Sequence, residues 1–133
     1  MLTNSVVINN IATISRLESN LLRIDYVKNC HVDLPQLEEV MKGYKKIAGD
    51  KPFYLLTIIP FGVTVSLEAR LQWRKPERSR FKLAEAMVLT DNLAHRLMYN
   101  FTMRVFPPKH KIRLFYSEKE GLKWLKNCMS FGY

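Results

Sequence analysis

The chain has 133 residues, of which 47% are hydrophobic and 25% charged, values typical of one globular domain. Its 21 Lys and Arg residues outnumber 12 Asp and Glu residues, and the net charge of +9 favours anionic partners such as nucleic acid, phosphate or an acidic protein face. The two cysteines are too few for a disulfide scaffold, and no apolar run approaches the roughly 20 residues of a membrane-spanning helix. We therefore expect a cytoplasmic protein with no signal peptide and no membrane span.

The first half of the chain predicts a hairpin, a helix and a buried strand. Residues 11–16 and 21–27 are short β-type runs joined by a turn. Asp33 and Gln36 form a capping box that opens an amphipathic helix. Residues 53–59 (FYLLTII) are a continuous apolar run, which is the pattern of a strand covered on both faces.

The second half predicts helices that alternate with strands. In order, we expect a short helix capped by Ser66, a strand over 82–89, a helix from Thr90 or Asp91 to about Arg104, a strand over 111–116, and a helix that Ser117 caps in a second capping box with Glu120. This order predicts an α/β fold in one domain. An N-terminal β-hairpin is followed by alternating α and β elements, which form a five-stranded mixed sheet with four helices mainly on one face.

Small side chains mark the place where a helix is expected to meet the sheet. Ala84, Ala86 and Val88 are two residues apart, so they share one face of their strand. Alanine lets a helix approach closely, and we expect Gly121, one turn into the last helix, to serve the same contact. The helices should therefore lie on the alanine face.

The stretch AEAMVLTDNL followed by an amphipathic helix, and the ending KIRLFYSEKEGLKWL, resemble the STAS (sulfate transporter and anti-sigma factor antagonist) domain. They resemble more closely the small bacterial STAS-like proteins of unknown function. In these proteins paired alanines, a strand ending in Phe and a helix ending in Ala-x-x-Trp-Leu recur, and here Gly121 stands in place of that Ala. The resemblance spans roughly residues 10–128 and implies the fold more than the function.

The resemblance also implies a phosphoacceptor. In phosphorylated STAS antagonists the acceptor is a serine at the N-terminus of the helix after the third strand, usually preceded by Asp. Ser66, with Thr64 as the second candidate, occupies this place, and no Asp precedes either residue. The residues alone favour the interpretation of Ser66 as a helix N-cap.

Helix starts that follow parallel strands gather along one edge of a sheet, and helix N-termini attract anions. The alternative, which we prefer, is that these residues are ordinary caps. The candidate anion-binding residues are Ser66, Thr90, Asn92 and Ser117.

The sheet face opposite the alanines is expected to mix charged and apolar side chains, which is typical of a partly polar protein interface. A symmetric homodimer is the partner that we expect there, and cover by residues 1–9 is the alternative. The candidate interface residues are Arg23, Asp25, Leu83, Glu85, Met87, Arg113 and Phe115.

Two basic segments, 70–82 and 104–113, interleave cations with Trp73 and Phe106, as single-stranded nucleic-acid binders do. Trp73 at helical spacing fits a core residue better. The candidate basic patch is Arg70, Arg74, Lys75, Arg78, Arg80, Lys109 and Lys111. A basic protein that binds nucleic acid or an anionic ligand is therefore the alternative function, and it is not the favoured one.

No motif for catalysis or metal binding is found. The three histidines lie far apart in the sequence, and neither GxSxG, GxGxxG nor a Walker-type loop occurs. We therefore expect no metal and no cofactor. The leading hypothesis is a non-enzymatic, cytoplasmic, STAS-like regulatory or protein-interaction domain whose protein partner is unknown.

Overall fold

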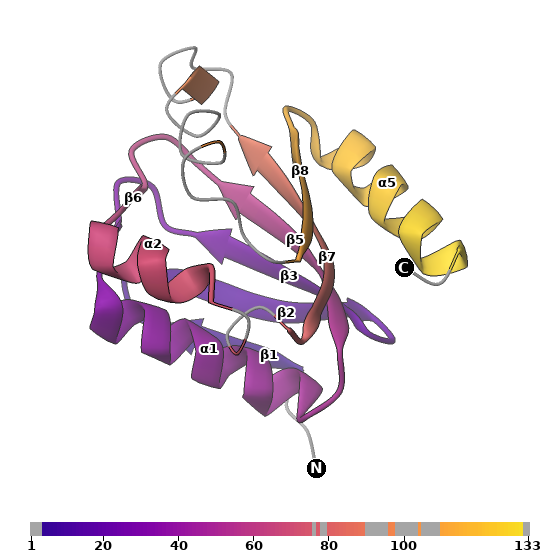
Figure 1. Cartoon of the computed structure of the whole chain (residues 1–133), viewed down its shortest axis with the longest axis horizontal. Helices are drawn as coiled ribbons and strands as arrows, with labels where there is room; N and C mark the ends of the chain where they lie inside the picture. The colour runs from indigo at the N-terminus through magenta and orange to yellow at the C-terminus, as the bar shows by residue number, and fades with distance from the viewer. Residues whose placement is uncertain are drawn as a thin grey trace.

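The computed structural model describes residues 4–75, 77, 80–89, 96–97, 104 and 110–131. Figure 1 shows strands that form a central sheet, with helices packed against it. The strands are β1 (Ser5–Ile8), β2 (Ala12–Glu18), β3 (Leu21–Tyr26), β4 (His31–Val32), β5 (Phe53–Ile59), β6 (Thr64–Val65), β7 (Lys82–Leu89) and β8 (Lys111–Phe115). The helices are α1 (Leu34–Ala48), α2 (Leu67–Trp73) and α5 (Glu118–Ser130).

The main sheet has six strands in the order β1-β2-β3-β5-β7-β8, and β4 pairs with β6 in a separate two-stranded sheet. The strands β1, β2 and β3 run antiparallel to one another, whereas β3, β5, β7 and β8 are parallel neighbours. The predicted N-terminal hairpin and mixed sheet are confirmed. The prediction of five strands is wrong, because residues 5–8 pair with β2 as an additional edge strand.

Polar side chains set the starts of the helices, as the sequence predicted. The Asp33 carboxylate accepts a hydrogen bond from the Leu34 amide at 2.9 Å, and the Gln36 side chain accepts one from the Asp33 amide at 3.0 Å. The Ser66 hydroxyl accepts from the Ala69 amide at 3.2 Å and so caps α2. No helix in the described part of the chain is long and apolar enough to cross a membrane.

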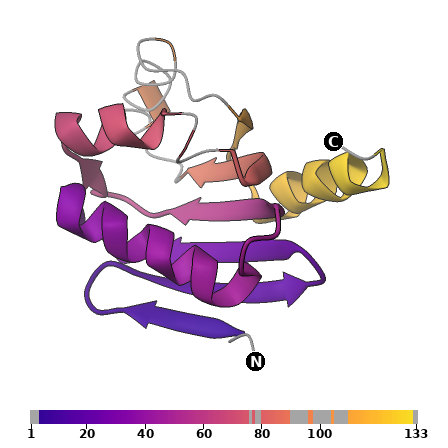
Figure 2. The same ribbon diagram turned by 60° about the horizontal axis from the view of Figure 1, so that its bottom comes forward.

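Helices cover both faces of the sheet, so the prediction that they lie mainly on one face is wrong. Adjacent side chains of β5 point to opposite faces: Leu55 packs in a cluster with residues of α1, and Leu56 packs in a cluster with residues of α5. In Figure 2, α2 and α5 lie at opposite ends of the molecule. Three helices are described where four were predicted, because most of the predicted helix from Thr90 or Asp91 to Arg104 lies outside the described residues.

The contact between α5 and β7 is the one that the alanines predicted. Ala84 and Ala86 are fully buried in one cluster with Leu125 of α5. A Cβ atom placed on Gly121 would lie 3.2 Å from Val88 Cγ2 and 3.5 Å from Ala86 Cβ, so a larger side chain would push α5 away. The face that carries α5 is called the α5 face below, and the opposite one is called the α1 face.

Candidate binding site

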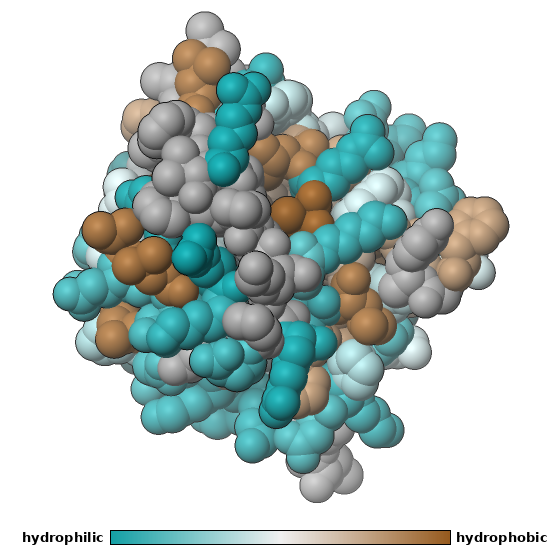
Figure 3. All heavy atoms as spheres, in the orientation of Figure 1, coloured by the Kyte–Doolittle hydropathy of each residue, from teal (hydrophilic) through white to brown (hydrophobic). Residues whose placement is uncertain are grey.

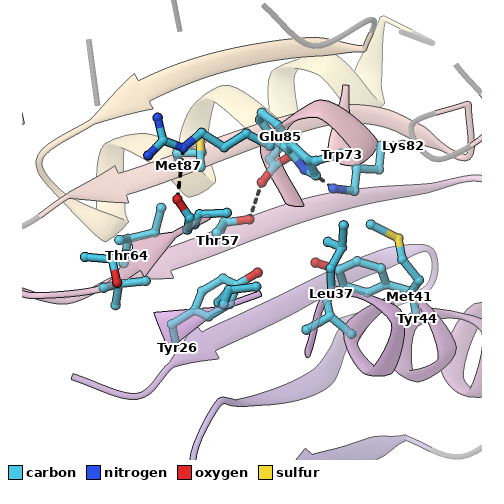
Figure 4. A pocket seen from close by; sticks show the side chains of 16 residues that line it. Tyr26, Leu37, Met41, Tyr44, Thr57, Thr64, Trp73, Lys82, Glu85 and Met87 are labelled. Atoms are coloured by element: carbon cyan, nitrogen blue, oxygen red, sulfur yellow. Dashed lines mark hydrogen bonds and ion pairs between the residues drawn. The ribbon is translucent and has the colours of Figure 1, made fainter. Parts of the chain in front are cut away.

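A cavity of about 120 Å³ lies between the α1 face of the sheet and the helices α1 and α2. Figure 4 shows Tyr26 and Thr57 on strands of the sheet, with Met41 and Tyr44 on α1 facing them. The walls are largely aromatic and aliphatic. The polar and charged side chains that reach the cavity are Thr57, Thr64, Arg70, Lys82 and Glu85, together with the hydroxyl groups of the two tyrosines.

Glu85 is the centre of a buried polar network beside this cavity. The Thr57 hydroxyl donates to Glu85 Oε2 at 2.6 Å, and His110 Nε2 donates to Oε1 at 2.7 Å. The Lys82 ammonium lies 3.5 Å from the same Oε1 atom. The side chains of Lys82, Glu85 and His110 are only 2–3% exposed, so the network is withdrawn from solvent.

Glu85 keeps its negative charge in spite of burial. Burial raises the pKa of the Glu85 carboxyl, but the charge of Lys82 and the hydrogen bonds from His110 and Thr57 outweigh it and lower the pKa from 4.5 to about 2. A buried carboxyl without such partners becomes neutral instead. The interior of the protein therefore holds a compensated pair of charges.

The Lys82 ammonium lies near two aromatic rings. Its Nζ atom is 5.4 Å from the centre of the Tyr44 ring and 5.5 Å from the centre of the Trp73 ring, within the range of cation–π attraction. The Trp73 ring in turn meets His110 edge-on, with ring centres 5.8 Å apart. The interpretation of Trp73 as an inward-facing residue is confirmed, because its ring forms part of the cavity wall.

A β-bulge in β7 brings Lys82 and Glu85 to the same side of the sheet. Residues three apart on a regular strand point to opposite faces. Here Lys82 pairs with Phe53, and Ala84 pairs with the very next residue of β5, so Leu83 is an additional residue. Leu83 packs in the cluster of the α5 face, and the alternation shifts by one position. Strict alternation would place Lys82 on the same face as Ala84 and Ala86, and the sequence offers no signal for the bulge.

The N-termini of α1 and α2 meet beside the strand pair β4 and β6. The Ser66 hydroxyl donates to Asp33 Oδ1 at 2.7 Å, and this bond, followed by the Leu34 amide, lowers the pKa of the Asp33 carboxyl. Thr64 is exposed, and its Oγ1 atom lies 2.7 Å from His31 Nδ1. This edge therefore already carries a carboxylate beside one of the two candidate phosphoacceptors.

The other predicted anion-binding residues are Ser117, Thr90 and Asn92. Ser117 caps α5, which packs on the α5 face, and Thr90 and Asn92 lie outside the described residues. Within the described residues, no group of three His, Cys, Asp or Glu side chains is placed to hold a metal ion.

The predicted interface residues do not share one face, so that prediction is wrong. In the parallel sheet Arg23 lies beside Leu56, whereas Thr57 lies beside Met87, and neighbours in register point the same way. The phase of each strand is set by its crossover connection, which strand periodicity does not reveal. Arg23, Asp25, Leu83, Arg113 and Phe115 lie on the α5 face, and Glu85 and Met87 are buried at the cavity. The homodimer itself stays a prediction.

The predicted basic patch is divided as well. Arg70 donates from Nε to the Val65 carbonyl at 3.0 Å and reaches the cavity. Lys111 lies on the α5 face, with Nζ 5.6 Å from the centre of the Trp124 ring. The remaining members are Arg74 and Lys75, which are exposed after α2, Arg80, which lies over the Phe81 ring, and Arg78 and Lys109, which lie outside the described residues.

Comparisons with known proteins support the fold. Residues 15–129 match the family model described as Domain of unknown function (DUF7793). The chain is also similar to the crystal structure of an uncharacterized protein from the DUF3478 family with a SpoIIAA-like fold from Shewanella loihica PV-4. The two are 14% identical, with a TM-score of 0.58 over 90% of this chain and 99% of that one. A search of curated proteins finds no match. The expected STAS-like fold is confirmed.

Proposed function

The chain belongs to the family described as Domain of unknown function (DUF7793), and from this premise we propose that it is a non-enzymatic, STAS-like regulatory domain that acts by binding another protein. The observation that carries the proposal is the apolar surface of α2. Both cysteines are buried free thiols, which suits the cytoplasm that we propose as its location.

The helix α2 exposes large apolar side chains. Leu67 is 54% exposed and Leu71 is 38% exposed, and their spacing of four residues places them on one side of the helix. Phe61, in the loop before β6, is 47% exposed. Figure 3 shows brown, apolar side chains gathered over α2. We call Leu67 and Leu71 the α2 surface, and apolar side chains that are exposed together are typical of interaction sites.

The charges around the α2 surface favour an acidic partner. Arg74 and Lys75 follow the helix directly and are exposed, and the whole chain has a net charge of +9. Two copies of a chain with this charge repel each other, whereas an acidic protein face is attracted. For the α2 surface we therefore propose a different protein, with an apolar contact patch bordered by Asp and Glu.

Thr64 is the better of the two proposed phosphoacceptors. A phosphate on Ser66 would place its negative charge against the Asp33 carboxylate, which the Ser66 hydroxyl already contacts at 2.7 Å. A phosphate on exposed Thr64 would lie beside His31, a group that can carry a positive charge. We propose that modification of Thr64 regulates the neighbouring α2 surface.

The test of partner binding compares two single substitutions of exposed apolar residues. Leu71→Glu alters the α2 surface, and Val7→Glu alters a 67% exposed residue of β1 as the matched control. We expect the unaltered protein and Val7→Glu to capture the same acidic protein from the native host. The purified partner should bind Leu71→Glu at least about tenfold more weakly, because a carboxylate replaces a buried apolar contact.

Three results would overturn this proposal. Equal binding by Leu71→Glu would place the contact elsewhere. Capture that disappears after nuclease treatment would support the nucleic-acid alternative. A dimer of this chain that Leu71→Glu dissociates, seen by light scattering, would make a second copy the occupant of the α2 surface.

Phosphorylation is tested by intact-mass measurement of protein purified from its native host in several growth states. We expect a phosphorylated fraction that Thr64→Ala removes and Ser66→Ala retains. The reverse pattern would assign the modification to Ser66 and contradict the electrostatic argument.

A further inference from the structure

We propose that the cavity under α1 and α2 binds a small, ring-bearing monocarboxylate, with the ring among the aromatic and Met side chains and the carboxylate against the Lys82 ammonium. This inference is independent of the partner proposed above. It follows from the size of the cavity, the chemistry of its walls and its balance of charges.

The size and walls select a single ring. The cavity volume is about 120 Å³, and an apolar cavity of about 150 Å³ holds one benzene molecule. Tyr26, Tyr44 and Trp73 supply aromatic surface, and Met41 and Met87 supply flexible thioethers that adapt to a ring. A larger lipid or a nucleotide exceeds this volume.

The charged side chains that line the cavity favour a ligand with one negative group. Among the described residues that line the cavity, Lys82 and Arg70 are cations and Glu85 is the one carboxylate, which leaves one excess positive charge. Beside the buried Lys82 and Glu85 side chains, this excess favours a monoanion and disfavours a cation. A dianion would carry one negative charge without a local counterpart.

Lys82 is the group that meets the ligand. Its Nζ atom lies 3.5 Å from Glu85 Oε1, which is longer than the 2.7–3.2 Å of an ordinary N–H···O hydrogen bond. The Glu85 oxygens are held more closely by Thr57 and His110, at 2.6 and 2.7 Å. Within the described part of the chain, Lys82 therefore keeps N–H donors for an added acceptor, whereas Glu85 is already engaged.

The first experiment compares three probes that share a ring and differ in charge: benzoate, benzyl alcohol and benzylamine. The protein carries Trp124→Phe, so that Trp73 at the cavity is the remaining tryptophan and its fluorescence reports binding. We expect benzoate to bind at least about tenfold more tightly than benzyl alcohol, because only benzoate adds a charge-assisted contact with Lys82. Benzylamine should not bind. Calorimetry on the unaltered protein checks the order.

The second experiment tests whether Lys82 is the residue that contacts the carboxylate of the ligand. Lys82→Met should weaken benzoate binding at least about tenfold and abolish the preference for benzoate over benzyl alcohol, whereas Lys111→Met, on the α5 face, should leave both affinities unchanged. Met41→Trp, which fills the cavity from α1, should abolish binding of both probes, and calorimetry measures it because the added tryptophan interferes with the fluorescence of Trp73. This variant also serves if Lys82→Met fails to fold.

Five outcomes would overturn the proposal. The first four are absence of benzoate binding, equal binding of benzoate and benzyl alcohol, preference for benzylamine, and benzoate binding that persists in Met41→Trp. Equal loss of benzoate affinity in Lys111→Met would attribute the effect to net charge and would also overturn it.

Discussion

The two faces of the sheet differ in how closely the helices pack on them and in whether they bury charged side chains. On the α5 face Ala84, Ala86 and Gly121 bring α5 into close contact with β7. On the α1 face, the same strand presents Lys82 and Glu85, and a cavity of about 120 Å³ remains beneath the helices. One strand thus separates a closely packed contact from a charged and incompletely filled one.

The difference indicates that the α5 face serves stability and that the α1 face serves a further role such as ligand binding. Close packing of small residues needs no polar partner and stabilises by burial and dispersion. Buried charges are costly unless they are paired, and a pair such as that of Lys82 and Glu85 adds little net stability compared with apolar residues of the same volume. Stability alone therefore explains the α5 face better than the α1 face.

The largest effect is expected from breaking the buried charge pair. Glu85→Leu leaves the Lys82 ammonium without its counter-charge in the interior and should lower the free energy of unfolding by about 3–5 kcal/mol. Urea unfolding measures the change. The double variant with Lys82→Met should regain most of the loss, and a single-variant loss below about 1 kcal/mol would show that the pair is not coupled.

Lowering the pH should also remove the stabilising charge of Glu85. The pKa of Glu85 is lowered from 4.5 to about 2 in the folded protein. The ionised Glu85 carboxylate therefore contributes fully to the free energy of unfolding above pH 4.5, and this contribution is lost as the pH falls toward 2. Because each pKa unit corresponds to about 1.36 kcal/mol, the free energy of unfolding should fall by about 3 kcal/mol over this range. Unfolding measured from neutral pH to pH 2 should show this decline. The double variant Glu85→Leu with Lys82→Met should lack it, and an equal decline there would assign it to other carboxyls.

Enlarging neighbouring residues of β7 compares the two faces directly. Ala86→Val adds volume to the closely packed α5 face and should cost about 1–3 kcal/mol, because side chains there must leave their preferred positions. Met87→Phe adds volume beside the cavity and should cost less than about 1 kcal/mol. Denaturant midpoints of the two variants decide the order, and a larger cost for Met87→Phe would contradict the comparison.

The smallest effect is expected from the ion pairs on the α5 face. Arg23 contacts Asp25 at 2.8 Å and Glu118 at 2.6 Å, but these side chains are 28–53% exposed. Asp25→Asn should therefore change the free energy of unfolding by about 0–1 kcal/mol, and the change should shrink at high salt. A loss as large as that of Glu85→Leu would show that exposure does not separate the two groups.

Local signals in the sequence predicted the parts of the fold that depend on neighbours along the chain. The capping box of Asp33 and Gln36 predicted the start of α1, and the spacing of the alanines predicted the contact with α5. The placement of Arg23 beside Leu56 depends on strand register, which is set by connections across the sheet. The edge strand β1 was missed because its four residues carry too short an alternation.

The candidate site was the part that the sequence revealed least. Glu85 was predicted to lie at a partly polar protein interface, because strand alternation placed it on one face with charged and apolar side chains. His110 lies 25 positions from Glu85 and became its partner only through the pairing of β7 with β8. The cavity itself depends on the separation of α1 from the sheet, which no spacing of residues along the chain encodes.

The bulge at Leu83 has a consequence for reading related chains. The additional residue reverses the relation between sequence position and sheet face in β7. Before it, even-numbered residues such as Lys82 point to the α1 face, and after it even-numbered residues such as Ala84 point to the α5 face. A relative that lacks the additional residue needs its inward cation two or four positions before the acidic residue, whereas a relative that keeps it needs the cation three positions before. The interval between these two residues is therefore a diagnostic for the site that can be applied to an alignment without any structure.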